Sequence, residues 1–196
     1  NNIELIRIFR QNDEKYTKIL NQIRKGVITK SSYECLMDLT KKTSTDPLMK
    51  PTILNPTRRA VEYINNKEMD MIPDEIKSFT AELSVNLPIT KGQESKRARF
   101  TDEEKTRELN YLMNNIMCDK VIHLKKGSQV LCIANLEMEG RYQICNGSQG
   151  VIIDFKNEYP IVKFNNGAER VMVPHIWASE NIPGVGVIQV PLILAW

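Results

Sequence analysis

The strongest structural signal in the sequence is CNGSQGVIIDFKNEYPIVKFNNGAERVMV, residues 145–173. Asn146-Gly147 and Asn166-Gly167 are strong turn signals, because both residue types tolerate a positive φ. Short runs rich in β-branched residues lie next to these turns and predict strands. The four strands that we expect are Gln129–Ala134, Gly150–Phe155, Ile161–Phe164 and Arg170–Val173. Four strands within about fifty residues predict a small all-β barrel.

The residues that precede this barrel predict helices. Apolar residues recur at the spacing of one helix face over Tyr16–Ile23. Asn12 or Asp13 can cap the first turn of that helix, and Gly26 supplies its end. A second, shorter helix is expected over Ser31–Leu39.

Two predicted strands lie on either side of these helices in the sequence, and a turn and a third helix follow the second strand. The alternation over Ile3–Phe9 and the apolar run Thr52–Leu54 both predict strands. Asn55-Pro56 turns the chain, and Thr57 can cap a helix that continues to Glu68. This order forms half of a βαβ unit, so we expect an α/β domain with a parallel sheet.

Three further segments complete the prediction. The basic run KGQESKRAR, residues 91–99, predicts an exposed loop. Thr101-Asp102-Glu103-Glu104 matches the capping box, in which the Thr and the Glu three residues later bond each other's backbone, and it predicts a helix. The apolar run Val187–Trp196 is long enough for a buried strand.

The composition excludes several classes of protein. The 196 residues are 41% hydrophobic with a net charge of only +3, which excludes a disordered chain. No apolar run approaches the roughly 18 residues that cross a bilayer, so we expect no membrane association. The first residues lack a secretion signal and are expected to be the middle of a longer chain. The four cysteines are expected to be reduced, which predicts an intracellular protein. The abundance of Asn and Lys is typical of an AT-rich genome and is compatible with a viral origin.

Neither the cysteines nor the known catalytic motifs predict chemistry of their own. Four cysteines with no C-x-x-C pair, and two histidines, are a poor ligand supply for zinc, so no metal site is expected. The sequence has no G-x-x-x-x-G-K-[ST] loop for phosphates, no strand ending in Asp-Glu for a magnesium ion, and no recognisable Ser/His/Asp set. Alone, the chain has no complete catalytic apparatus.

Several short blocks span nearly the whole chain. They are Phe9-Arg10-Gln11 with Ile23–Gly26, Pro51–Thr57 with Val61 and Ile64-Asn65, Leu124–Val130, Asn135-Leu136, Cys145–Val151, Val162–Phe164 with Arg170-Val171, and Gln189–Trp196. Together and in this order they resemble the PIF family of superfamily-one DNA helicases. The first block is similar to its motif IV, and the last is similar to the residues that lead into its motif V.

The resemblance implies a motor of two RecA-like domains that couples ATP hydrolysis to 5′-to-3′ movement along single-stranded DNA. Residues 1–124 and 175–196 would form the second RecA-like domain, incomplete before motif V. Residues 125–174 would form an inserted small barrel of the Src-homology-3 type. The fold class expected is therefore α/β, an incomplete RecA-like parallel-sheet domain with an inserted all-β barrel. An upstream RecA-like domain would carry the phosphate loop and the magnesium-binding acid.

The same resemblance assigns the nucleotide contacts. ATP would lie between the two RecA-like domains, and an arginine of the second domain would neutralise charge on its γ-phosphate. Arg10 occupies the matching position in motif IV, with Gln11 beside it. ATP and Mg²⁺ are the expected cofactors, bound mainly by the upstream domain. The plainer alternative for Arg10 is a surface arginine in a salt bridge.

The expected DNA-binding residues are Thr57, Arg58, Asn65, Lys125 and Lys126. Thr57 lies at a predicted helix start, where its hydroxyl and the free backbone N–H groups can bind a phosphate. Arg58 and the two lysines add positive charge, and Asn65 can bond backbone or base. Each has an ordinary alternative: an N-cap, a solvated charge or a polar residue that faces water.

The function predicted is the C-terminal motor portion of an ATP-dependent DNA helicase in replication, repair, recombination or telomere maintenance. It would act in the nucleus of a eukaryote or at a viral replication site. The portion alone is expected to be inactive. The alternative is a non-enzymatic module, derived from a helicase, that binds nucleic acid or a protein.

Overall fold

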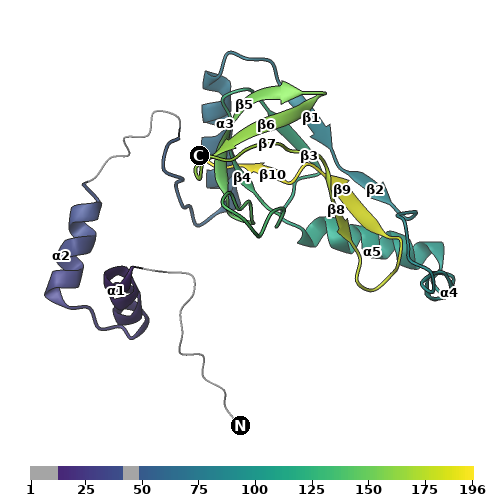
Figure 1. The fold of residues 1–196 in the computed structure, drawn as a ribbon, viewed down its shortest axis with the longest axis horizontal. Helices are drawn as coiled ribbons and strands as arrows, with labels where there is room; N and C mark the ends of the chain where they lie inside the picture. The colour runs from purple at the N-terminus through teal and green to yellow at the C-terminus, as the bar shows by residue number, and fades with distance from the viewer. Residues whose placement is uncertain (1–12, 42–48) are drawn as a thin grey trace, which may run out of the picture. The chain divides into compact units, whose positions relative to one another are not determined.

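The protein is described by a computed structural model of residues 13–41 and 49–196, which divides into two units (Figure 1). Residues 1–45 form the first unit, whose described part holds helices α1 (Glu14–Arg24) and α2 (Lys30–Leu39). Both predicted helices are confirmed. Asp13 caps α1 by accepting the backbone N–H of Tyr16 at 3.0 Å, and Gly26 follows the helix with a φ of 69°.

Residues 46–196 form the second unit, in which antiparallel strands are combined with helices. A five-stranded sheet has the order β10-β4-β5-β6-β7, a three-stranded sheet has the order β2-β9-β8, and β1 pairs with β3. The strands are β1 (Lys77–Thr80), β2 (Glu82–Ser84), β3 (Val121–Leu124), β4 (Gln129–Cys132), β5 (Gln149–Lys156), β6 (Tyr159–Phe164), β7 (Glu169–Val171), β8 (His175–Ala178), β9 (Gly186–Gln189) and β10 (Leu192–Leu194). The helices are α3 (Arg58–Met71), α4 (Glu94–Arg97) and α5 (Asp102–Asn115).

The four strands predicted for the barrel are confirmed as β4 to β7. The glycines of both Asn-Gly turns have positive φ, 96° at Gly147 and 87° at Gly167. The strands enclose a core that includes Phe164, Ile152 and Val162, with Ile122 and Leu124 of β3 packed into it. The four strands therefore form an antiparallel sheet whose core also includes residues from outside the predicted barrel.

Gly150 is the one position in β5 where a side chain has no room. A Cβ built there would lie 2.5 Å from Cγ1 of Val162 and 2.7 Å from the carbonyl oxygen of Lys163. Distances this short are not tolerated between packed atoms, so glycine allows β5 and β6 to pair closely at this point.

The predicted parallel sheet is not found among the described residues, because every strand pair there is antiparallel. The predicted strand Thr52–Leu54 is wrong as well. Those residues form no ladder, and the Leu54 side chain is 93% exposed. Pro51 and Pro56 flank the segment and have no backbone N–H to give to a neighbouring strand. The predicted strand Ile3–Phe9 lies outside the described residues.

The predicted final strand, Val187–Trp196, is two strands in different sheets. β9 pairs with β2 and β8, whereas β10 pairs with β4, and the break falls at Val190-Pro191. Proline cannot donate to a ladder, so it ends the pairing of β9. Residues 192–194 therefore share a sheet with residues that we expected in a separate barrel. The boundaries at 125 and 174 stay a prediction.

A second, smaller core joins α5 to the three-stranded sheet (Figure 1). Leu109 of α5 packs there with Ile182 and Val185, which precede β9. The segment 91–99 is not purely a loop, since it contains the short helix α4. Arg97 ends that helix and donates to the carbonyl oxygen of Val85 at 2.8 Å, so part of the predicted loop is held against the fold.

No helix within residues 13–41 and 49–196 is both long enough and apolar enough to cross a membrane.

We predict that Thr101→Ala weakens the fold through the N-terminus of α5. The capping box is confirmed, with Thr101 Oγ1 accepting the N–H of Glu104 at 3.3 Å and the Thr101 N–H donating to Glu104 Oε2 at 2.7 Å. Loss of such a cap lowers the free energy of unfolding by about 1 kcal/mol. Urea unfolding measures the loss, and Thr106→Ala on the same helix is the control.

The cap also carries a pH dependence. The backbone and hydroxyl bonds of Thr101 hold the pKa of Glu104 below its ordinary value of 4.5. Their contribution to stability is complete above that pH and is lost as the pH falls through the lowered value. The difference between Thr101→Ala and the parent should therefore shrink in acid. A difference that grows in acid would contradict this assignment.

Candidate nucleic-acid interface

The N-terminus of α3 presents free N–H donors and positive charge on the surface. Thr57 is the N-cap, and its hydroxyl accepts the backbone N–H of Ala60 at 3.4 Å. Thr57, Arg58 and Arg59 are exposed. The first N–H groups of a helix lack partners within it and carry partial positive charge, so this end of α3 suits a phosphate. The predicted N-cap is confirmed, and a DNA contact here stays a prediction.

The segment that leads to Thr57 is fixed by glutamine and threonine side chains. Gln129 donates to the carbonyl oxygen of Lys50 at 2.9 Å and accepts the Lys50 N–H at 2.9 Å. Thr52 donates to the carbonyl oxygen of Ala195 at 3.0 Å and accepts from Gln149 at 2.7 Å. These bonds attach the approach to α3 to β4, to β5 and to the residues after β10.

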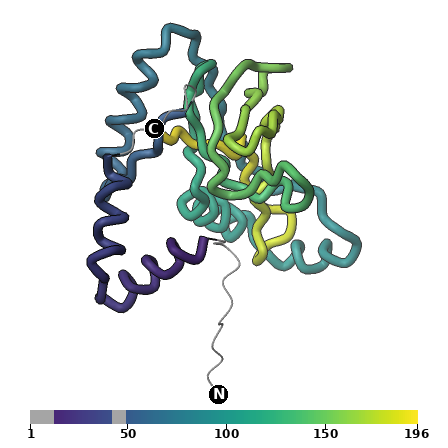
Figure 2. The backbone as a smooth tube through the Cα atoms, turned by 60° about the vertical axis from the view of Figure 1, so that its left-hand side comes forward, coloured from purple at the N-terminus to yellow at the C-terminus, as the bar shows by residue number. Residues whose placement is uncertain are grey.

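Asn65 does not present its amide on the surface, which the predicted DNA contact would require. The residue is 8% exposed, and its amide donates to the carbonyl oxygen of Leu194 at 3.2 Å. Its oxygen accepts the N–H of Trp196 at 3.3 Å. Figure 2 shows the end of the chain beside α3, where these bonds form. Asn65 lies on the face of α3 that packs inward, as do the flanking apolar residues.

The two predicted lysines have opposite environments. Lys125 is 8% exposed, and its Nζ donates to the carbonyl oxygens of Met69 and Ile72, at 2.9 Å and 2.7 Å. Lys126 is exposed, with its Nζ 4.0 Å from Asp154 Oδ1. Only Lys126 has its charge on the surface, where a phosphate can reach it. The sequence does not distinguish the two because both are charged and adjacent.

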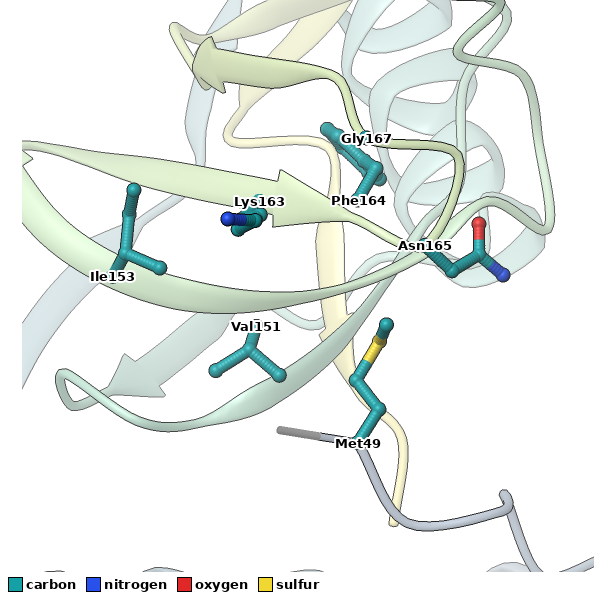
Figure 3. Close-up of a pocket in the computed structure, with 7 residues that line it drawn as sticks. All are labelled: Met49, Val151, Ile153, Lys163, Phe164, Asn165 and Gly167. Atoms are coloured by element: carbon teal, nitrogen blue, oxygen red, sulfur yellow. The ribbon is translucent and has the colours of Figure 1, made fainter. Parts of the chain in front are cut away.

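A small pocket opens on the outer face of β5 and β6 (Figure 3). Its volume is about 150 Å³, and Val151, Ile153 and Lys163 line it together with Met49 from the segment before α3. Lys163 is within 3.4 Å of Glu169. The pocket is thus mostly apolar with one paired charge, and sequence reasoning did not identify it.

A metal centre and a reactive thiol each place requirements on the titratable side chains of the described residues. Within the ranges that the structure describes, no three His, Cys, Asp or Glu side chains are grouped as metal ligands. Burial raises the pKa of Cys118 to about 11 and raises the pKa of Cys132. Both thiols are therefore protonated near neutral pH and unsuited to nucleophilic work.

Trp177 and His175 lie after the predicted barrel, on β8. Their rings meet edge to face with centroids 4.8 Å apart, and both side chains are half-buried. Burial also lowers the pKa of His175. The Trp177 ring is therefore packed in part against the His175 ring of the same strand.

The predicted nucleotide contacts Arg10 and Gln11 lie outside the described residues. Gln129 and Gln149, by contrast, hold the segment before α3 through their side-chain amides and were not predicted to do so. A signal for them does exist, because each ends a Gly-Ser-Gln triplet, at 127–129 and at 147–149. In both triplets the serine hydroxyl accepts the N–H three residues earlier, of Lys125 and of Cys145.

Comparison with known proteins gives consistent matches. The family model "DNA helicase Pif1, 2B domain" matches residues 109–155. "ATP-dependent DNA helicase PIF1" of Emericella nidulans is 28% identical over 196 residues, which cover 94% of this chain and 23% of that protein. "ATP-dependent DNA helicase RRM3" of Saccharomyces cerevisiae is 29% identical over 161 residues, which cover 82% of this chain and 19% of that protein. The chain thus spans about a quarter or less of the length of these relatives.

Solved structures agree with the sequence matches. The crystal structure of Pif1 helicase from Candida albicans aligns with a TM-score of 0.58 and 27% identity, over 97% of this chain and 45% of that one. Pif1 from Bacteroides sp. in complex with ADP-AlF4 aligns with a TM-score of 0.63 at 20% identity, over 97% of this chain and 40% of that one, and shows a shared fold. The viral origin suggested by composition receives no support from these matches.

Proposed function

We propose that this chain forms the C-terminal motor portion of an ATP-dependent DNA helicase of the Pif1 family. The whole protein would unwind duplex DNA by moving 5′-to-3′ along a single strand, in replication, repair, recombination or telomere maintenance. The observation that carries the proposal is the match to the Emericella helicase over 94% of the chain. A match over nearly the whole chain favours a shared function, because a single shared domain would match only part of it.

The domain arrangement is part of the proposal. Residues 1–124 and 175–196 belong to the second RecA-like domain, and residues 125–174 form an inserted barrel of the Src-homology-3 type. The antiparallel strands β4 to β7 around Ile152 and Phe164 support the barrel, and residues from outside these bounds, Leu124 and Leu192 among them, pack into the same core. The Pif1 2B domain match over residues 109–155 also supports it, since that range includes β3, β4 and most of β5, together with the second half of α5.

The nucleotide would lie between this domain and an upstream RecA-like domain of the same protein. Because the sequence has no phosphate loop, ATP and Mg²⁺ are held mainly by the upstream residues. Mg²⁺ neutralises charge on the phosphates when it is bound. From this chain Arg10 would place its guanidinium at the γ-phosphate, with Gln11 beside it, and stabilise the charge that develops during hydrolysis.

Single-stranded DNA would cross the N-terminus of α3. Thr57 and Arg58 offer a hydroxyl, free N–H groups and a guanidinium there, and Lys126 adds an exposed ammonium beside the sheet. Contacts of this type bind the phosphate backbone and carry no base preference. This is what movement along any sequence requires. The protein would therefore act at an intracellular site that holds DNA, the nucleus in a eukaryotic cell.

A second candidate is a non-enzymatic module that binds nucleic acid or a protein. It is favoured by the five-stranded sheet, whose core does not depend on the helices α4 and α5. In this reading the sheet alone would bind DNA as tightly as the whole chain. In the motor reading Arg58, outside the sheet, contributes to binding.

We predict that Arg58→Ala weakens binding to single-stranded DNA and reduces its salt dependence. Each phosphate contact with a single strand contributes a slope of roughly −0.7 in log K against log salt, so losing one contact should flatten the slope by about that amount. Fluorescence anisotropy of a labelled oligo-dT at several salt concentrations measures both. Lys67→Ala, which removes an exposed charge farther along α3, is the matched control. An unchanged slope for Arg58→Ala would remove this contact from the interface.

We also predict that Arg10→Ala in the full-length helicase abolishes DNA-stimulated ATP hydrolysis. An arginine that stabilises a transferring phosphoryl group is worth about 10³-fold or more in rate. Arg107→Ala, an exposed arginine on α5 that lies outside the family blocks, should leave the rate unchanged. The 196-residue chain alone should hydrolyse no ATP with Mg²⁺ present. Hydrolysis by the pure chain would contradict the proposed division of labour between the two domains.

A further inference from the structure

We propose that Lys125 is a positioning residue for DNA binding, which acts through α3 on Thr57 and Arg58. It does so from inside the protein, by holding the C-terminal end of that helix. The inference rests on the proposed function in one respect, namely that the N-terminus of α3 meets the DNA backbone. The anchoring of the helix is independent of DNA.

The Lys125 ammonium caps the C-terminal end of α3. Its Nζ donates to the carbonyl oxygens of Met69, in the last turn, and of Ile72, the C-cap. The last carbonyl groups of a helix have no partner within it and carry partial negative charge, so a cation is favourable there. The bond to Met69 adds to the one that this oxygen already accepts from the Ile72 N–H, and the bond to Ile72 satisfies a part-buried oxygen.

The turn that carries Lys125 holds its backbone rigidly. The Lys125 N–H donates to Ser128 Oγ at 2.9 Å, and that hydroxyl in turn donates to the Met69 sulfur at 3.1 Å. Gly127 has a φ of 91°, which suits glycine, and its N–H donates to the carbonyl oxygen of Ile152. The turn is therefore attached to β5 and to α3 at once. Lys125 thus links the helix to the five-stranded sheet.

Asn65 provides a second anchor on the same helix. Its amide bonds the backbone of Leu194 and Trp196, so the middle of α3 is attached to the residues that end the chain. Thr57 lies eight residues before Asn65, about 12 Å along the axis at 1.5 Å per residue. The DNA-binding end therefore extends beyond both anchors. A small tilt at the anchors moves the Thr57 hydroxyl and the Arg58 guanidinium together.

A direct phosphate contact by Lys125 fits these observations less well. To reach a phosphate, its Nζ would have to give up both bonds and leave the part-buried carbonyl oxygen of Ile72 without this partner, which is costly. Lys126 next to it already has its charge on the surface. The adjacent lysines thus have different roles. Lys125 holds the helix, and Lys126 carries a surface charge that is accessible to single-stranded DNA.

A double-mutant cycle with labelled oligo-dT tests the inference in the 196-residue chain. Lys125→Met should weaken binding about tenfold, the effect of one lost charged hydrogen bond, and leave the salt slope unchanged. In a Thr57→Ala/Arg58→Ala background the same substitution should have a much smaller effect, because only the backbone N–H groups remain to be positioned. Lys126→Met, the matched control, should flatten the slope in both backgrounds. A flattened slope for Lys125→Met, or an equal effect in both backgrounds, would overturn the inference.

A spectroscopic measurement without DNA separates this inference from the proposed function. Nitroxide labels at Arg59 on α3 and at Gln143, an exposed residue outside it, report the position of the helix by pulsed electron spin resonance in a chain with its native cysteines replaced. Lys125→Met and Ser128→Ala should each broaden the distance distribution, and Lys126→Met should not. An unbroadened distribution in both variants would overturn the anchoring. If these variants broaden the distribution but the parent chain binds no DNA, the proposed function is refuted and the anchoring of α3 is not.

Ser128→Ala also guards against a variant that fails to fold. It keeps the charge of Lys125 but removes the hydroxyl that orders its turn. Circular dichroism establishes the folded fraction of every variant before binding is measured. If Lys125→Met does not fold, Ser128→Ala must still weaken DNA binding without changing the salt slope. If the Ser128→Ala variant binds DNA as tightly as the parent does, the inference is wrong.

Discussion

A network of buried amide and hydroxyl side chains holds the helix α3, the segment before it and the end of the chain together. Gln129 alone bonds the backbone of Lys50 on one side and of Ala195 on the other. Polar groups that are shielded from water cost free energy unless all their bonds are made, and no buried side-chain nitrogen or oxygen of the described residues lacks a partner. Such a network tolerates few alternatives, so it specifies one arrangement of the helix where apolar packing alone would allow several.

Features that depend on a few neighbouring residues could be predicted from the sequence. The capping box at Thr101 and the two Asn-Gly turns were predicted correctly because their geometry is set within four residues. The strand at Thr52–Leu54 was wrong because a strand needs a partner, and the partner is not specified locally. The final apolar run could not be divided between two sheets by its composition, although Pro191 marks the division.

The roles of individual polar residues were harder to predict, since the sequence does not show which of them are buried. Asn65 and Lys125 have the residue types expected of DNA contacts, yet their polar atoms bond the backbone of distant residues. Thr57 and Arg58 are local features of a helix start, and their placement followed directly from the pattern. The repeated Gly-Ser-Gln triplet was the one available signal for the buried glutamines. Its meaning depends on β4 and β5 being neighbours, which becomes clear only once the sheet is known.

The corner at Val190-Pro191 has a mechanical consequence. Val190 and Leu192 on either side of the proline are almost wholly buried, and the Leu192 N–H donates to the Val190 carbonyl oxygen at 2.8 Å. The three-stranded and five-stranded sheets are thus joined through β9 and β10 by a tight, enclosed connection that has no slack. Tension applied to one sheet would pass along the backbone to the other before either could rotate freely. In a protein that steps along a polymer, such a stiff joint would transmit displacement where a flexible linker would absorb it.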